Sequence, residues 1–234
     1  MATNLSPVIV ALDFPNSTQA LTLARQLDPA RCRVKVGKEL FTRAGPSVVE
    51  ELQSLNFDVF LDLKFHDIPN TVAGACRSAA ELGCWMVNVH ASGGKSMLEA
   101  AAEAVQNSIH RPLLIAVTIL TSIDNDALRA LGFGDSTESK TQHLATLAHQ
   151  AGLDGVVSSA HDVATTKQNF GREFLTVTPG IRPAGSASAD QARIATPKGA
   201  VDAGADYLVV GRPITQADEP LSALEQILTE INPR

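Results

Sequence analysis

The chain has 234 residues, of which 44% are hydrophobic and 19% charged, and its formal net charge at pH 7 is −6. This net charge argues against nucleic acid as a partner, and no apolar run approaches the length of a membrane span. The length predicts one large globular domain over residues 1–234, or at most two small ones. Cys32, Cys76 and Cys84 show no metal-ligand spacing, so we expect reduced packing residues in a cytoplasmic protein.

Short apolar strands alternate with helices along the chain. The expected strands are 8–13, 33–38, 58–64, 85–90, 113–120, 155–159, 174–180 and 207–211. The expected helices are 19–27, 45–55, 71–82, 96–106, 140–151, 161–168, 190–203 and 220–231, with a further short helix at 124–131. Proline at position 197 is expected to break the helix 190–203.

This alternation of strands and helices predicts an α/β fold with parallel strands and right-handed crossovers. Eight such units favour a single (β/α)8 TIM barrel. An open doubly wound sheet is the alternative. The turn at 13–16 after the first strand lacks the glycine-rich dinucleotide fingerprint, which makes the open sheet less favoured.

The third strand carries charges where a strand of a barrel is normally apolar. Asp62 and Lys64 are two residues apart, so on a regular strand they point to the same side. A structural ion pair at the end of a strand would explain these two residues alone, because buried ions are costly unless they pair. A third charge at Asp67, the rigid exit at Pro69 and an inward Lys35 on the second strand favour a catalytic cluster instead.

Polar residues recur at the expected C-terminal ends of the strands, where barrels of this type hold their active sites. These residues are Asp13, Lys35, Asp62, Lys64, His90, Thr121, Arg182, Gly211 and Arg212. The pair Gly211-Arg212 alone would be read as a tight turn with a solvated arginine. With Arg182 on the neighbouring loop it predicts a phosphate site, because glycine lets backbone N–H groups approach an anion and arginine can clamp it.

These motifs resemble the orotidine 5′-monophosphate decarboxylase family in its bacterial form. The resemblance rests on residues 11–13, 34–37, 60–71, 178–183 and 211–213, in the family's order and over nearly the whole chain. It implies conversion of orotidine 5′-monophosphate to uridine 5′-monophosphate and CO₂ in pyrimidine biosynthesis. It also implies that the enzyme uses no cofactor or metal and is a homodimer with shared active sites.

The resemblance further implies a role for each matching residue. Lys64 would protonate C6 of the pyrimidine, Asp62 would lie beside the departing carboxylate, and Lys35 and Asp67 would complete a chain of alternating charges. By the same resemblance, Asp13 and Lys35 would contact the ribose, Asp62 the reacting carboxylate and Thr121 the pyrimidine. The phosphate would be bound by Arg182, Gln191, Gly211 and Arg212. Contacts across a dimer would come from Asp67, Ile68 and Thr71.

One position departs from the family pattern. Some relatives have a pyrimidine-binding serine three residues after the threonine, where this chain has Asp124. Ser122 or a backbone group is the alternative for this contact.

Three other functions fit part of the pattern. A magnesium-dependent decarboxylase of a ketogulonate phosphate shares the acid–lysine–acid run, but Lys35 stands where its metal carboxylate is expected. A Schiff-base aldolase could use Lys64, although the flanking carboxylates favour the ammonium over the free amine. A non-enzymatic phosphoribosyl-binding protein would not need the chain of charges.

Overall fold

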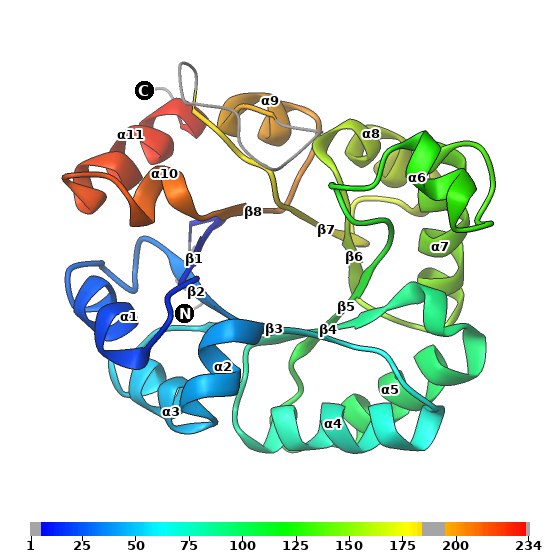
Figure 1. Cartoon of the computed structure of the whole chain (residues 1–234), viewed down its shortest axis with the longest axis horizontal. Helices are drawn as coiled ribbons and strands as arrows, with labels where there is room; N and C mark the ends of the chain where they lie inside the picture. The colour runs from blue at the N-terminus through cyan, green and yellow to red at the C-terminus, as the bar shows by residue number, and fades with distance from the viewer. Residues whose placement is uncertain (1–5, 184–194, 233–234) are drawn as a thin grey trace.

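Eight parallel strands, paired in chain order, close into a barrel (Figure 1). The structure, a computed structural model, describes residues 6–183 and 195–232. The strands are β1 (Val8–Ala11), β2 (Arg33–Gly37), β3 (Val59–Phe65), β4 (Met86–His90), β5 (Leu113–Val117), β6 (Gly155–Val157), β7 (Leu175–Thr178) and β8 (Tyr207–Val210). The predicted (β/α)8 barrel is therefore confirmed, and the open-sheet alternative is wrong, because β1 pairs with β8.

Helices surround the barrel in the same order (Figure 1). They are α1 (Ser17–Ala24), α2 (Lys38–Ala44), α3 (Ser47–Ser54), α4 (Pro69–Glu81), α5 (Lys95–Gln106), α6 (Asn125–Ala130), α7 (Thr137–Gln150), α8 (Ala160–Phe170), α9 (Pro197–Asp202), α10 (Arg212–Thr215) and α11 (Pro220–Ile231), with a 3₁₀ turn η1 (Ala91–Gly93). The short elements α2, η1 and α10 were not predicted. α2 and η1 follow directly after β2 and β4, and α10 begins two residues after the end of β8. η1 and α10, of three and four residues, are too short to show helical periodicity.

Three of the described helices, α4, α9 and α11, begin at a proline, and the sequence placed only the start of α11 correctly. The sequence placed the start of α4 at Thr71, but the helix begins at Pro69, which suits the first turn because its fixed φ is helical and it needs no N–H partner. The first residues of the expected helix 190–203 lie outside the described residues. Within the described residues α9 begins at Pro197, and the Thr196 side chain accepts a hydrogen bond from the N–H of Gly199.

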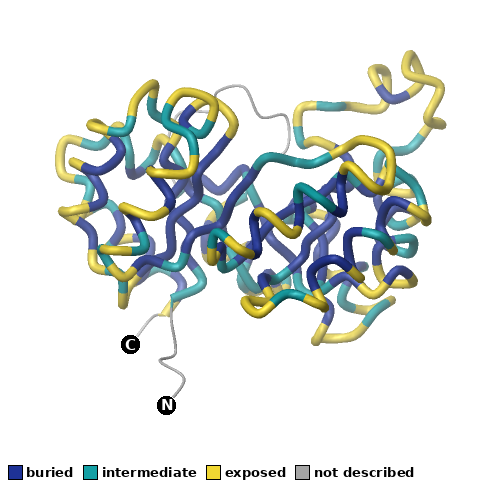
Figure 2. Tube along the Cα trace, turned by 90° about the horizontal axis from the view of Figure 1, so that it is seen from below, coloured by how far each residue is buried: buried dark blue, intermediate teal, exposed yellow. Residues whose placement is uncertain are grey.

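Side chains of the strands form two apolar layers. Ile9, Phe60, Met86, Ile115 and Val177 fill the inside of the barrel. A larger cluster lies between the strands and the helices, and the strands are largely buried (Figure 2). On β3 the alternation places Val59 and Leu61 in this larger cluster, as predicted, so that Asp62 shares the inner face with Phe60.

Arg33 closes the N-terminal end of the barrel. Its guanidinium donates to Asp58 at 3.2 Å and to the carbonyl of Ser6 at 2.8 Å. It also lies 4.3 Å from the ring centroid of Trp85 and 5.2 Å from that of Tyr207. The residue is only 8% exposed, so both polar and aromatic contacts satisfy a nearly buried cation.

Replacing this arginine should destabilise the fold. We expect Arg33→Leu to lower the free energy of unfolding by about 1–3 kcal/mol, because a buried cation–π contact and two hydrogen bonds are lost. Urea unfolding followed by fluorescence of Trp85, the single tryptophan of the chain, measures the change. The matched control is Arg31→Leu, which removes an exposed ion pair with Glu225 and should cost less than about 1 kcal/mol. Equal losses in the two variants would contradict the assignment.

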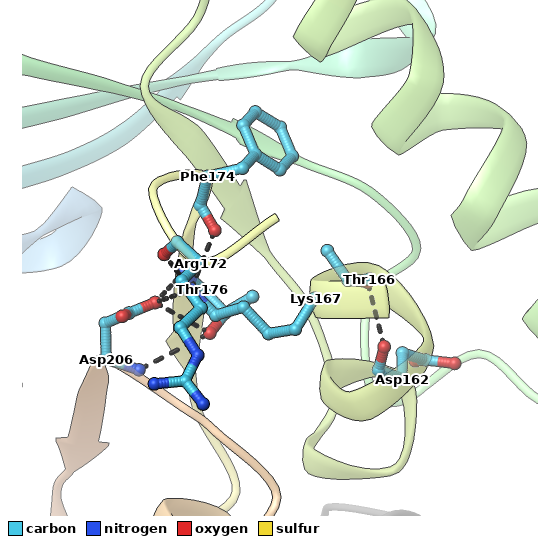
Figure 3. Close-up of polar contacts among 7 residues, drawn as sticks. All are labelled: Asp162, Thr166, Lys167, Arg172, Phe174, Thr176 and Asp206. Carbon is cyan, nitrogen blue, oxygen red and sulfur yellow. Dashed lines mark hydrogen bonds and ion pairs between the residues drawn. The ribbon is translucent and has the colours of Figure 1, made fainter. Parts of the chain in front are cut away.

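A second polar network ties α8 to the starts of β7 and β8 (Figure 3). The ammonium of Lys167 donates to the carbonyls of Arg172 and Phe174, at 2.9 and 2.8 Å, and pairs with Asp206 at 2.6 Å. The same carboxylate oxygen accepts from the N–H and the hydroxyl of Thr176, at 2.6 and 3.0 Å. This network lies where β7 and β8 begin, so it stabilises the end of the barrel opposite the C-terminal strand ends.

Candidate active site

A cavity of about 630 Å³ opens at the C-terminal ends of the strands. Its charged lining residues come from five segments of the chain and are Asp13, Lys35, Lys38, Asp62, Lys64, Arg182 and Arg212. A cavity at this end of a parallel barrel is where active sites of the fold are built. Lys38, the last residue of the expected strand 33–38, was not among the predicted site residues, although its place at a strand end was a signal for it.

Four of the predicted residues form one connected chain of charges. The ammonium of Lys35 lies 2.9 Å from an oxygen of Asp13 and 3.3 Å from an oxygen of Asp62. The ammonium of Lys64 lies 2.5 Å from the other oxygen of Asp62. Asp62 therefore lies between two lysines, and Lys64, at the end of the chain of charges, is the more exposed of the two lysines.

The backbone around Lys64 departs from the regular strand that the sequence predicted. Leu61 pairs with Val87 and Phe65 with Val89, so three residues of β3 stand opposite a single residue of β4, Asn88. Lys64 has φ +54°, a left-handed conformation that is uncommon for residues other than glycine. Such bulges redirect side chains beside active sites.

Sequence reasoning missed Asn88. Its amide group donates to an oxygen of Asp62 at 2.7 Å and accepts from the N–H of Lys64 at 2.8 Å. The residue is 1% exposed. The signal was available, because Asn88 is the polar residue in the middle of an otherwise apolar strand segment and lies two positions after the inward Met86.

The electrostatics keep these groups charged. Burial alone would raise the pKa of Asp62, but Lys35 and Lys64 outweigh it, and the pKa lies below its usual value. Burial alone would lower the pKa of Lys35, but Asp62 and Asp13 raise it above its usual value. The ion pair of Asp62 and Lys35 thus contributes fully to the free energy of unfolding from about pH 4 to about pH 10. This contribution is lost as pH falls through the pKa of Asp62 or rises through that of Lys35.

His90 lies beside this cluster and should remain neutral. Its ring centroid is 5.4 Å from that of His66. Burial lowers the pKa of His90 to about 4, and the charges of His66, Lys38 and Lys64 add to the effect. The side chain of His90 is half-buried and lines a smaller neighbouring cavity.

The lowered pKa of His90 predicts a pH dependence of stability. The unfolded chain binds a proton at this histidine below about pH 6.5, whereas the folded chain resists protonation down to about pH 4. Stability should therefore fall between pH 7 and pH 5, by about 1–2 kcal/mol from this residue. Urea unfolding at both pH values should show a smaller loss in His90→Asn than in the unchanged protein. Equal losses would contradict the assignment.

The two predicted phosphate loops line the same cavity. Arg182 follows β7, and Gly211 and Arg212 follow β8. Gly180 has φ +79°, a conformation that favours glycine and lets the loop after β7 turn sharply. The structure therefore brings both arginines to one side of the cavity, and Gln191, the remaining predicted phosphate residue, lies outside the described residues.

Thr121 and Ser122 also line the cavity, whereas Asp124 does not. Asp124 instead precedes α6, and its carboxylate accepts a hydrogen bond from the N–H of Ala127 at 2.8 Å. The position that departs from the family pattern is thus used to cap a helix.

Three predicted residues are not part of this cavity. Asp67, Ile68 and Thr71 are exposed and do not line it, and the carboxylate of Asp67 accepts from the N–H of Ile68 at 2.6 Å. Ile68 is 67% exposed, which is unusual for a large apolar side chain. Within residues 6–183 and 195–232, no group of three or more His, Cys, Asp or Glu side chains could hold a metal ion. Among the helices that the structure describes, none is both long and apolar enough to cross a membrane.

Comparisons with known proteins agree with this arrangement. Residues 6–227 match the model of the orotidine 5′-phosphate decarboxylase / HUMPS family. The orotidine 5′-phosphate decarboxylase of Alcanivorax borkumensis is 58% identical over 226 residues, which cover 97% of this chain and 98% of that protein. The orotidine 5′-phosphate decarboxylase of Nitrosococcus oceani is 57% identical over 227 residues, with 97% and 98% covered. The crystal structure of the Lactobacillus acidophilus enzyme of that name superposes with a TM-score of 0.86 at 42% identity, covering 97% of this chain and 99% of that one.

Proposed function

This chain belongs to the orotidine 5′-phosphate decarboxylase / HUMPS family, and we propose that it converts orotidine 5′-monophosphate to uridine 5′-monophosphate and CO₂. The observation that carries the proposal is the ammonium of Lys64, held 2.5 Å from Asp62 and lining a cavity that also holds two arginines. The cavity thus has a proton donor and a phosphate site. Orotidine 5′-phosphate, the nucleotide in the names of the relatives, would use both, because it has a ring carbon to be protonated and a phosphate.

In the proposed reaction the bond between C6 of the pyrimidine and the carboxylate breaks, and its electron pair stays on C6. No neighbouring group of the ring can spread this charge, so a fixed cation next to C6 lowers the barrier. Lys64 then gives a proton to C6 and is left as a neutral amine, which regains a proton from solvent. Asp62 holds the ammonium of Lys64 in place before the reaction, and its negative charge lies where the substrate carboxylate would approach.

The remaining lining residues would bind the rest of the nucleotide. Asp13, which follows β1, and Lys35 of β2 form an ion pair and would contact the ribose hydroxyls. Thr121, with Ser122, would contact the pyrimidine. Arg182, Gln191, Gly211 and Arg212 would bind the phosphate, whose binding energy would hold C6 against Lys64 although it is remote from the reacting carbon.

We propose that the active sites are shared in a homodimer. Asp67, Ile68 and Thr71 do not line the cavity of their own chain, and Ile68 exposes a large apolar side chain. A second copy would bring these residues over the cavity, with Asp67 completing the chain of charges.

We further propose that residues 1–234 act as one catalytic domain and that the protein works in the cytoplasm. The three buried, free cysteines support this compartment.

An assay without metal tests the reaction. After treatment with a chelator the purified protein should consume orotidine 5′-monophosphate, seen as a loss of absorbance, and produce uridine 5′-monophosphate. A requirement for magnesium, or turnover of a ketogulonate phosphate in place of the nucleotide, would contradict the proposal. Trapping of a substrate on Lys64 by borohydride would also contradict it, because this requires a Schiff base.

A further inference from the structure

One side chain, that of Asn88, connects the two groups at the centre of the proposed reaction. It bonds the carboxylate of Asp62 at 2.7 Å and the backbone N–H of Lys64 at 2.8 Å. We propose that Asn88 is a positioning residue for the decarboxylation, whose amide fixes Asp62 and the backbone of Lys64 so that the ammonium is aimed into the cavity. This inference rests on the proposed function.

The amide of Asn88 matches the chemistry of both partners. The backbone N–H of Lys64 can only donate, and the ionised carboxylate of Asp62 can only accept. A side chain that bonds both must therefore offer an acceptor and a donor on one short, rigid group, which asparagine does. An aspartate would offer only acceptors, and a leucine would offer neither.

The bulge of β3 explains why this bond affects the direction of Lys64. Three residues of β3 stand against Asn88 alone, so the strand pairing is interrupted between Leu61 and Phe65. The backbone N–H of Lys64 bonds the side chain of Asn88 instead of a backbone carbonyl of β4. The left-handed conformation of Lys64 is then held by a side chain rather than by the regular ladder.

Asn88 is suited to this task because its surroundings leave it little freedom. It is 1% exposed and stands opposite Ile115 of β5. The charged and titratable groups around it are Asp62 and Lys64 of β3, Lys35 beyond Asp62, and His90 on its own strand, whereas β5 carries no titratable residue. A rigid amide between two reacting groups preserves a distance on which turnover depends steeply.

Two variants test the inference with steady-state kinetics. Asn88→Leu keeps the branched shape and the number of side-chain heavy atoms, is somewhat larger, and removes both bonds, so kcat should fall by about 10²-fold while KM changes by less than about threefold. Asn88→Asp keeps the acceptor but places a carboxylate against Asp62. Two adjacent carboxylates share a proton more readily, so the introduced carboxyl group, once protonated, would donate to Asp62 and restore part of the activity as pH is lowered. The kcat profile of this variant should therefore rise toward acid pH relative to that of the unchanged protein.

The matched control is Thr176→Val, which removes a buried hydroxyl bond to Asp206 where β7 and β8 begin (Figure 3). It should lower stability and leave kcat unchanged. The inference would be overturned if kcat of N88L lay within threefold of that of the unchanged protein. It would also be overturned if kcat of N88D depended on pH in the same way as that of the unchanged protein. If N88L does not fold, the dependence of kcat on pH in the isosteric N88D tests the inference instead. An unchanged protein without decarboxylase activity would overturn the proposed function as well, whereas an active one with unaffected N88L and N88D would overturn this inference alone.

Discussion

Lys64→Ala should reduce kcat by at least about 10⁴-fold, because the change removes the proton donor and the cation that faces the developing charge. The fold should survive the change. Asp62 keeps Lys35 and Asn88 as partners, so no unpaired charge is left buried. Alanine at φ +54° is strained no more than lysine. Measurement of kcat together with thermal unfolding separates the loss of chemistry from a loss of structure.

Lys64→Arg separates the two roles of the lysine. Arginine keeps the positive charge but holds its proton too tightly to give it to carbon at neutral pH. If proton donation is required, this variant should be nearly as inactive as Lys64→Ala. Lys95→Ala, an exposed lysine of α5 paired with Glu99, is the matched control and should have unchanged kcat. Turnover of Lys64→Ala within tenfold of the unchanged protein would remove Lys64 as the acid.

Mixing two inactive variants should restore activity if sites are shared between subunits. Asp67→Ala and Lys35→Ala should each be almost inactive alone, since each breaks the same chain of charges. In a mixed dimer one site receives both changes and the other receives neither. With equal amounts and free exchange, half the dimers are mixed, so about a quarter of the full activity should return.

The control for this experiment keeps both changes in one chain. The double variant Lys35→Ala/Asp67→Ala, mixed with Lys35→Ala, should recover nothing, because every site then lacks Lys35. Recovery that follows the formation of mixed dimers supports shared sites. No recovery in dimers shown to be mixed would place Asp67 outside the partner's site.

The sequence predicted the barrel and most of the charged cavity because both depend on periodic features. Strand alternation placed Lys35 and Asp62 on inner faces, and the structure has their side chains in contact. The same assumption of a regular strand concealed the bulge at Lys64, since a local change of φ leaves no trace in a period of two. Asn88 was missed for a related reason, because its partners are a backbone group and a carboxylate on another strand.

Other differences come from short elements and from residues that the proposed dimer would use between chains. A helix such as α10, four residues long, has no repeat for periodicity to detect. Asp124 could be compared with a family position, but its capping bond depends on where α6 begins. The proposed partner of the exposed Ile68 is a second chain, so periodicity within one chain carries no signal for it.

The closure of the barrel has a consequence for synthesis of the chain. Asp13, Lys35, Asp62 and Lys64 all leave the ribosome early, yet β1 can pair with β8 only after Val210 has been made. Until then the nascent polypeptide holds the ionic half of the cavity beside an open sheet edge and without the arginine of the last loop. Contacts between such distant parts of a sequence form slowly and leave strand edges open to other chains. Chains truncated before β8 should therefore aggregate and be degraded rather than accumulate as partly active enzyme.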